Sequence, residues 1–253
     1  MTVSFSVLFF ALGALVASFV GVVVARLNTG HSFVTGRSRC DACDTTLSAL
    51  ALVPVISYFV FRGRARCCGA RLSLSAPLTE LLLGGLFTLS YLKLDIVFLL
   101  LPLFLGLSLL LALVLYDLMH QILPPVLLWL FVATAVVIGY MHAGTLGDFR
   151  VAVLVAGAIA LFFVAIHVFS RGHAMGLADA PLAFGLALLT GPEFALAGLA
   201  FSFWIGAVVG ITILLQRPRG HRMGIEVPFA PFLAAGFLLA YFIQWNPFAI
   251  IAA

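Results

Sequence analysis

Two aspartates stand at the boundaries of apolar stretches, where a charged side chain is costly. Asp117 follows a leucine-rich run and opens the segment DLMHQILPP, and Asp179 ends the segment GLAD before PLAFGLALL. If the fold brings the two carboxylates within a few ångströms, they cannot both ionise easily. One then keeps a proton and acts as an acid, while the other activates water as a base. The pair therefore predicts peptide hydrolysis without a metal ion or covalent intermediate, and the sequence does not assign the proton to either residue.

A second interpretation places both aspartates at helix ends in water. Asp179 would then cap the helix near Pro181, because Asp followed closely by Pro is a common helix start. After Asp117, the residues His120 and Gln121 followed by Leu-Pro-Pro predict a helix that ends in a polar, rigid turn. His120 lies near one helical turn from Asp117, so it would contact the pair or remain an interfacial polar residue. The choice depends on the elements that hold the aspartates.

Those elements have the composition of a membrane protein. Hydrophobic residues make up 64% of the 253-residue chain and charged residues 9%, with a mean hydropathy of +1.25, whereas a soluble domain is about a quarter charged. Apolar runs near the spanning length predict an all-α polytopic membrane protein with about eight transmembrane helices. The alternating strands of a β-barrel are not the pattern. The predicted spans are 4–25, 77–92, 95–116, 125–141, 150–170, 180–190, 194–215 and 229–251, of which 180–190 is too short to cross alone.

Basic residues fall mainly on one side of these spans. Eleven lie on one side, against Lys93 and Arg150 on the other. The eleven are Arg26, Arg37, Arg39, Arg62, Arg64, Arg66, Arg71, Arg171, Arg217, Arg219 and Arg222. The positive-inside rule places the eleven in the cytoplasm, both termini outside and both aspartates at the cytoplasmic edge. The net charge of +4 is thus explained by topology, and no nucleic-acid partner is predicted.

The chain divides into three predicted segments. Residues 1–26 form an anchor that is retained rather than cleaved, because no basic residue precedes it and Arg26 follows it. Residues 27–76 form a cytoplasmic loop with the four cysteines, and residues 77–253 form the membrane body. Cys40 and Cys43, with Cys67 and Cys68, have the residue types of a structural zinc site. Unligated thiols are the alternative, and a reducing cytosol disfavours a disulfide.

Five separate segments, in order, resemble one family. They are ASFVGVVVARL, then CDAC with SYFVFRGRARCC, then PLTELLLGG, DLMHQILP, and finally GLAD followed by VPFAPF. The chain resembles the type IV prepilin peptidases, polytopic aspartic peptidases of the inner membrane with a Gly-x-Gly-Asp motif. The resemblance covers most of the chain. When the loop is aligned with the family pattern, Ala65 takes the position of the family's third cysteine, so that one ligand is lost. Cys67 would then replace that lost ligand.

The resemblance implies a function and a site. Asp117 and Asp179 would be the catalytic pair, supported by Gly176, His120 and Pro124. The enzyme would remove the leader of type IV prepilins or type II secretion pseudopilins at the cytoplasmic face of the bacterial inner membrane. It would also methylate the new N-terminus with S-adenosylmethionine, using the cysteine loop, whereas no cofactor is needed for cleavage. The substrates and the lipid bilayer are the expected partners.

The basic segment of the loop provides the candidate residues for the cofactor. Arg62, Gly63 and Arg64 would meet an anionic group, or the arginines would only fix the topology at acidic lipid headgroups. Glu80 stands in the first turns of a predicted span, where the helix dipole favours a carboxylate, and it also matches an acid of the family.

Three departures from the family pattern adjoin the aspartates. Ala178 replaces the second glycine of the motif, Pro181 replaces a lysine, and Pro125 replaces an acid. They leave two rival functions open. One is an impaired relative that binds prepilins without cutting them. The other is a transporter with the acids in a proton path, although a transporter would more naturally place acids at mid-membrane.

Overall fold

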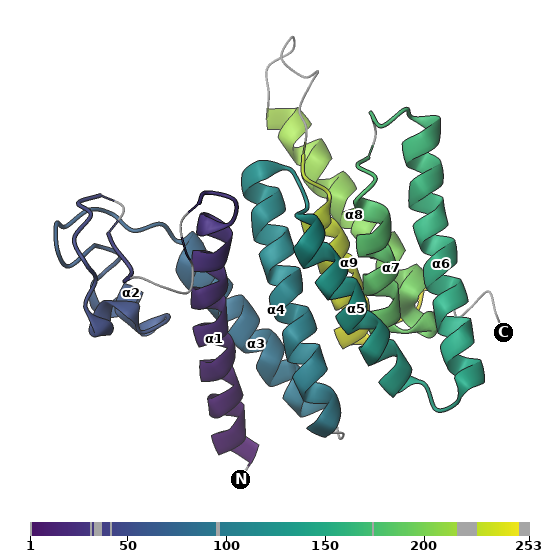
Figure 1. Ribbon diagram of the computed structural model, residues 1–253, viewed down its shortest axis with the longest axis horizontal. Helices are drawn as coiled ribbons and strands as arrows, with labels where there is room; N and C mark the ends of the chain where they lie inside the picture. The colour runs from purple at the N-terminus through teal and green to yellow at the C-terminus, as the bar shows by residue number, and fades with distance from the viewer. Residues whose placement is uncertain are drawn as a thin grey trace. The chain divides into compact units, whose positions relative to one another are not determined.

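The structure is a computed structural model that describes residues 2–30, 32, 37–40, 42–94, 97–173, 175–216 and 227–247. Within these residues the chain is helical, and it forms two isolated β-bridges but no strand. The helices are α1 (Thr2–Arg26), the 3-10 helix η1 (Ala49–Leu52), α2 (Ile56–Val60), α3 (Ser75–Lys93), α4 (Val97–His120), α5 (Pro125–His142), α6 (Leu146–Phe169), α7 (Asp179–Thr190), α8 (Pro192–Gln216) and α9 (Ala230–Ile243) (Figure 1). The all-α membrane fold predicted from composition is confirmed: five of the described helices (α1, α4, α5, α6 and α8) are long and apolar enough to span a bilayer.

The chain forms two compact units, Met1–Ala112 and Leu113–Ala253, with the division inside α4. In the first unit α1 packs along α3. Their backbones come close at two glycines: a Cβ on Gly13 would lie 2.7 Å from the Leu83 carbonyl oxygen, and one on Gly84 would lie 2.9 Å from the Phe10 carbonyl oxygen. Small residues that allow such an approach are typical of packed membrane helices.

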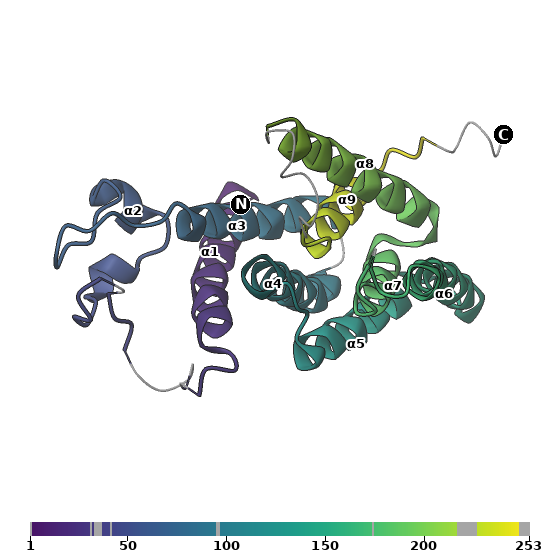
Figure 2. The ribbon, with the colours of Figure 1, turned by 90° about the horizontal axis from the view of Figure 1, so that it is seen from above.

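The second unit is built around α7, which packs against α5, α6, α8 and α9. Figure 2 shows α7 beside α5 and α6. Most residues of α7 are buried. Its 12 residues span about 18 Å, short of the roughly 30 Å of a bilayer core. α7 is therefore the partial helix that the sequence predicts at 180–190, and its first residue lies within the packed bundle.

Two helix ends differ from those predicted. The span expected to end at 116 continues to His120, so Asp117 lies inside the last turn of α4. This helix ends where Gln121 adopts a left-handed conformation and its N–H donates to the Asp117 carbonyl oxygen. The prediction that the last helix runs to 251 is wrong: α9 ends at Ile243 and Gln244 is left-handed. The backbone before Pro247 disfavours a helix, and 248–251 lie outside the described residues, as do Arg217, Arg219 and Arg222.

The glycine contact between α1 and α3 predicts which of two adjacent substitutions is tolerated. Gly84→Val should destabilise the first unit by about 1–3 kcal/mol, because the new side chain meets the backbone of α1. Gly85→Val is the matched control, since a Cβ at Gly85 meets nothing within 4 Å. The measurement is thermal unfolding of the purified protein in detergent. Equal melting temperatures for the two variants would contradict the packing described.

Candidate active site and metal centre

A cavity of about 750 Å³ lies in the second unit and is lined by residues from three separated segments. The first is the end of α4 with the turn after it, which contributes Asp117 and Leu123. The second is the loop from Gly172 to Asp179, and the third is the segment Val227 to Phe229 just before α9. These are the three motif regions of the membrane body, so the fold brings together what the sequence separates by about a hundred residues.

Asp117 is buried in the last turn of α4, with 7% of its surface exposed. It receives a hydrogen bond from the backbone of Ala230, the first residue of α9. Its Oδ2 atom is buried and has no hydrogen-bond partner among the described residues. Burying a carboxylate oxygen without a hydrogen-bond donor is costly. Because Asp117 lines the cavity, a substrate or a water molecule there could provide the donor.

Asp179 is the first residue of α7 and is 8% exposed. Its Oδ2 atom accepts a hydrogen bond of 3.2 Å from the backbone N–H of Gly176. Asp179 and Asp117 are also close enough to interact electrostatically. Each carboxylate therefore lies at the N-terminal end of a helix, Asp179 on α7 and Asp117 against α9, where the helix dipole favours negative charge.

The three departures from the family motif fit ordinary backbone geometry. Ala178 precedes α7 with φ −69° and ψ −17°, a conformation that alanine adopts without strain. Pro181 lies in the first turn of α7, and Pro125 is the first residue of α5. Proline is tolerated in the first turn because those N–H groups have no partner within the helix. The two proline replacements thus remove charges near the site, and all three replacements leave the helix starts intact.

The other predicted supporting residues lie at different distances from the cavity. Gly176 lines it and holds Asp179. Pro124 is buried and precedes α5, and its neighbour Leu123 lines the cavity. His120 is exposed, and its ring lies 4.4 Å from that of Tyr116. The structure therefore places His120 at the exposed end of α4 rather than among the residues that line the cavity.

Two contacts from outside the predicted site residues position the site, and sequence reasoning missed the first of them. One is the backbone N–H of Ala230, which bonds Asp117. The other is a hydrogen bond of 2.9 Å between His167 Nδ1 and the carbonyl oxygen of Met175, which ties α6 to the loop before Gly176. Main-chain groups carry no residue type, so only the histidine could have been found from sequence, as a polar residue inside an apolar helix.

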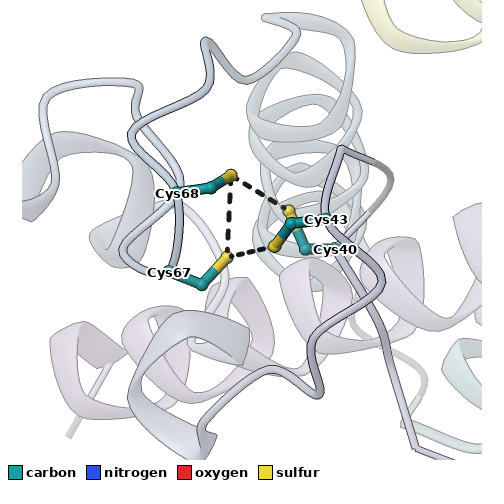
Figure 3. A group of neighbouring side chains, drawn as sticks. All are labelled: Cys40, Cys43, Cys67 and Cys68. Atoms are coloured by element: carbon teal, nitrogen blue, oxygen red, sulfur yellow. Dashed lines mark hydrogen bonds between the residues drawn. The ribbon is translucent and has the colours of Figure 1, made fainter.

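The four cysteines come together in the first unit (Figure 3). Their sulfur atoms all lie within 4.8 Å of one another. The sulfur–sulfur separations include 3.3 Å for Cys43–Cys67, 3.8 Å for Cys40–Cys68 and 3.9 Å for Cys67–Cys68. Four sulfurs bound to one zinc ion at about 2.3 Å would be about 3.8 Å apart. The donor set and its spacing therefore fit a tetrahedral metal ion.

The two halves of the cysteine cluster are built on two separate backbone turns with the same hydrogen-bond pattern. In the first half, Cys40 N–H donates to the Thr45 carbonyl and Asp44 N–H donates to the Cys40 carbonyl. In the second half, Ala65 N–H donates to the Ala70 carbonyl and Gly69 N–H donates to the Ala65 carbonyl. Ala65 thus occupies the position of Cys40 in its own turn. The missing sulfur is provided by Cys67 from the tip of that turn.

Neighbouring groups give the thiols of Cys43 and Cys67 different pKa values. Hydrogen bonds with the side chain and backbone of Thr45 lower the pKa of Cys43 to about 6. The hydrogen bond with Cys43 raises the pKa of Cys67 to about 12. Cys43 therefore ionises more readily than Cys67, and the thiolate is the form that binds metal.

Of the candidate cofactor residues Arg62, Gly63 and Arg64, only Arg64 lines a cavity. Arg64 lines a cavity of about 370 Å³ in the first unit. Arg62 and Gly63 form a left-handed turn, with φ of 51° and 66°. A Cβ on Gly63 would lie 2.8 Å from the Tyr58 hydroxyl oxygen, so a side chain would clash there. Gly63 is thus explained by the turn itself.

Comparison with known proteins agrees with this arrangement. Residues 11–94 match the model of the bacterial peptidase A24 N-terminal domain, and residues 103–211 match that of the type IV leader peptidase family. No solved structure matches the chain. Three curated relatives are named prepilin leader peptidase/N-methyltransferase. The Bacillus subtilis protein is 30% identical, with 92% of this chain and 92% of the relative covered.

The other two relatives extend the same pattern. The Pseudomonas putida protein is 30% identical, with 88% of this chain and 85% of the relative covered. The Myxococcus xanthus protein is 36% identical over 85% of this chain, which spans only 65% of that relative. The predicted membership in an enzyme family of leader peptidases and N-methyltransferases is confirmed. With its aspartates in one cavity and its cysteines in one cluster, the chain belongs to the type IV leader peptidase family.

Proposed function

We propose that this protein is a membrane aspartic endopeptidase that removes the leader peptide of type IV prepilins or type II secretion pseudopilins. The observation that carries the proposal is the cavity shared by two buried carboxylates, Asp117 and Asp179. Its three walls are the three motif segments of the family. Its volume of about 750 Å³ lies within the range of substrate pockets.

In the proposed reaction, one of the two carboxylates acts as a base and the other as an acid. One takes a proton from water, whose oxygen attacks the peptide carbonyl carbon, while the other gives a proton to the departing amine as the C–N bond breaks. The backbone N–H groups of Gly176 and Ala230 hold the carboxylates throughout. Because these donors are part of the main chain, they stay in place whichever carboxylate carries the proton.

Methylation is the second activity we propose, on the strength of the relatives' shared name. S-adenosylmethionine, when bound, supplies a methyl group from its sulfonium: the S–CH₃ bond breaks, an N–CH₃ bond forms on the neutral amine, and the amine proton leaves to solvent. The acceptor amine is the one that cleavage releases. Cleavage must therefore precede methylation.

We place the enzyme in the bacterial inner membrane with its active site at the cytoplasmic face. The support is the distribution of eleven basic residues on one side of the predicted spans and two on the other. Asp117, three residues before the end of α4, then lies near the membrane boundary. A basic leader in the cytosol joined to an apolar prepilin helix would meet a site at this depth.

Replacement of either aspartate should abolish cleavage. Asp117→Asn and Asp179→Asn each keep the size of the side chain but remove the proton-transfer group, so we expect a loss of at least about 10²–10⁴-fold in the rate of leader removal. The measurement is cleavage of a purified prepilin by the detergent-solubilised enzyme, with mass spectrometry of the product to detect an added methyl group.

Glu193→Gln is the control for that experiment, because Glu193 is exposed at the start of α8. It should cleave at the wild-type rate. Full activity of either aspartate variant would refute a pair in which both members act. A wild-type protein that binds prepilin but leaves its leader intact, where an active relative cuts, would show the non-catalytic alternative.

We also propose that the four cysteines bind one structural zinc ion remote from the chemistry, because a closed four-sulfur site leaves no position for substrate. Cys67→Ala should lose the metal, measured as bound zinc per chain by elemental analysis. Adding Ala65→Cys to that variant should restore it, since Ala65 holds the position of Cys40 in the equivalent turn. Full zinc content in the Cys67→Ala variant would exclude Cys67 as a ligand.

A further inference from the structure

The loop that carries the cysteines has an apolar outer surface. Ile56, Phe59 and Val60 fall at the i, i+3 and i+4 positions of one face of α2. Their side chains are 61%, 66% and 65% exposed. Leu50, on the neighbouring helix η1 that contacts α2, is 65% exposed. We call these four residues the apolar face of the loop.

The other face of α2 is turned to the interior of the first unit. Ser57, Tyr58 and Phe61 are half-buried and line the cavity of about 370 Å³. α2 therefore has one side packed within its own unit and an opposite side that is apolar and exposed. Exposed apolar patches normally mark an interaction site, so a loop surrounded by water would leave this face without a partner.

The same cavity gives the depth of the loop in the membrane. Ser18 of α1 lines it together with Tyr58 of α2. Ser18 lies about two turns before Arg26, the last residue of α1, or about 12 Å along the helix. α1 has 25 residues, so when centred in the bilayer it exceeds the roughly 30 Å hydrocarbon core by about 4 Å at each end. The part of α1 that meets this cavity thus lies within the apolar layer.

The contact between α1 and α3 leads to the same conclusion. Gly13 of α1 lies against Leu83 and Gly84 of α3, and the two helices run antiparallel. The length from Gly13 to the end of α1 is about 20 Å, whereas from Gly84 back to Ser75, the start of α3, it is about 13 Å. α3 therefore begins about 6 Å nearer the membrane centre than α1 ends. The chain must descend below the end of α1 to enter α3.

Arginines follow the apolar face directly in the chain. Arg62, Arg64 and Arg66 are exposed, and among the described residues none of them forms an ion pair. Guanidinium groups beside an exposed apolar helix match the phosphates of anionic lipids above their acyl chains. They would repel the basic leader of a prepilin. Charge therefore favours lipid over substrate as the partner of this face.

We propose that the apolar face of the loop is inserted into the bilayer, with its four side chains among the acyl chains and the three arginines at anionic headgroups. Interfacial helices enter the membrane by about 5–10 Å, which agrees with the depth at which α3 begins. The cysteine loop is then a membrane-surface module whose metal centre is held at the bilayer boundary. Neither cleavage nor methylation requires this, so the inference goes beyond the proposed function.

The test is photocrosslinking from the full-length protein in vesicles of phosphatidylethanolamine and phosphatidylglycerol. The photoreactive residue p-benzoylphenylalanine replaces Phe59, and mass spectrometry detects phospholipid adducts on the peptide that contains it. We expect a lipid adduct at this position. The matched control carries the same residue in place of Phe61, on the inward face of α2. It should give severalfold less lipid adduct and crosslink within the protein instead.

Phe19 is the positive control, because it is 53% exposed on α1 and adjoins Ser18. The photoreactive residue there should give lipid adducts in a yield comparable to that at Phe59. Vesicles of phosphatidylcholine alone should lower the yield at Phe59 but not at Phe19, since only the loop is held by arginines. An unchanged yield at Phe59 would overturn the role of the anionic headgroups. Melting temperatures equal to that of the wild type verify that each variant is folded.

Lipid adducts at Phe19 without any at Phe59, or equal yields at Phe59 and Phe61, would overturn the insertion of the loop. A crosslink from Phe59 to an added prepilin that displaces the lipid adduct would assign the face to the substrate instead. A crosslink to a second copy of the chain would assign it to a dimer. None of these readouts depends on leader removal, so the peptidase proposal is tested separately.

Discussion

Two carboxylates buried in an apolar helical protein need hydrogen-bond donors that do not come from water. Here the donors are backbone N–H groups: Gly176 for Asp179 and Ala230 for Asp117. Both lie where a short helix begins, α7 in one case and α9 in the other. The shortness of these helices is thus part of the site, because each must start inside the bundle for its N-terminus to reach a carboxylate. Longer helices would carry their N-termini past the cavity.

This constraint explains the packing of the second unit. α7 is surrounded by four helices, so neither of its ends can move without cost. The loop before it is held by His167 through Met175, which limits where Gly176 can point. The departures at Ala178, Pro181 and Pro125 are tolerated because they fall at helix starts, where the backbone makes no demand that they violate. What the two prolines remove is charge near the site.

In the first unit, a loop with few helical residues is held together by its cysteine cluster and by Glu80. Its cysteine loop has little regular structure, with only η1 and the five-residue α2 as helices. Two matching turns instead bring four sulfurs together, and the irregular Cys67–Cys68 pair compensates for Ala65. Glu80 then connects this loop to α3 through Val55. Cys40 of the cysteine cluster and the buried Glu80 thus line one and the same cavity.

The amino-acid sequence by itself determined the class of fold, most helix positions, the segment with the cysteines and the two aspartates as candidates. These follow from local properties: apolar run length, the side on which arginines fall, and motif spacing. It misplaced the end of α9, because the apolar run continues beyond the residues where the helix stops. The helix ends at Ile243, where Gln244 is left-handed, and the backbone before Pro247 disfavours a helix. It could not show that Asp117 lies within α4 and meets Ala230, or that the four cysteine sulfurs lie within 4.8 Å of one another. Only the tertiary structure decided these, because they depend on main-chain groups and on segments tens of residues apart, and neither leaves a pattern in a single sequence.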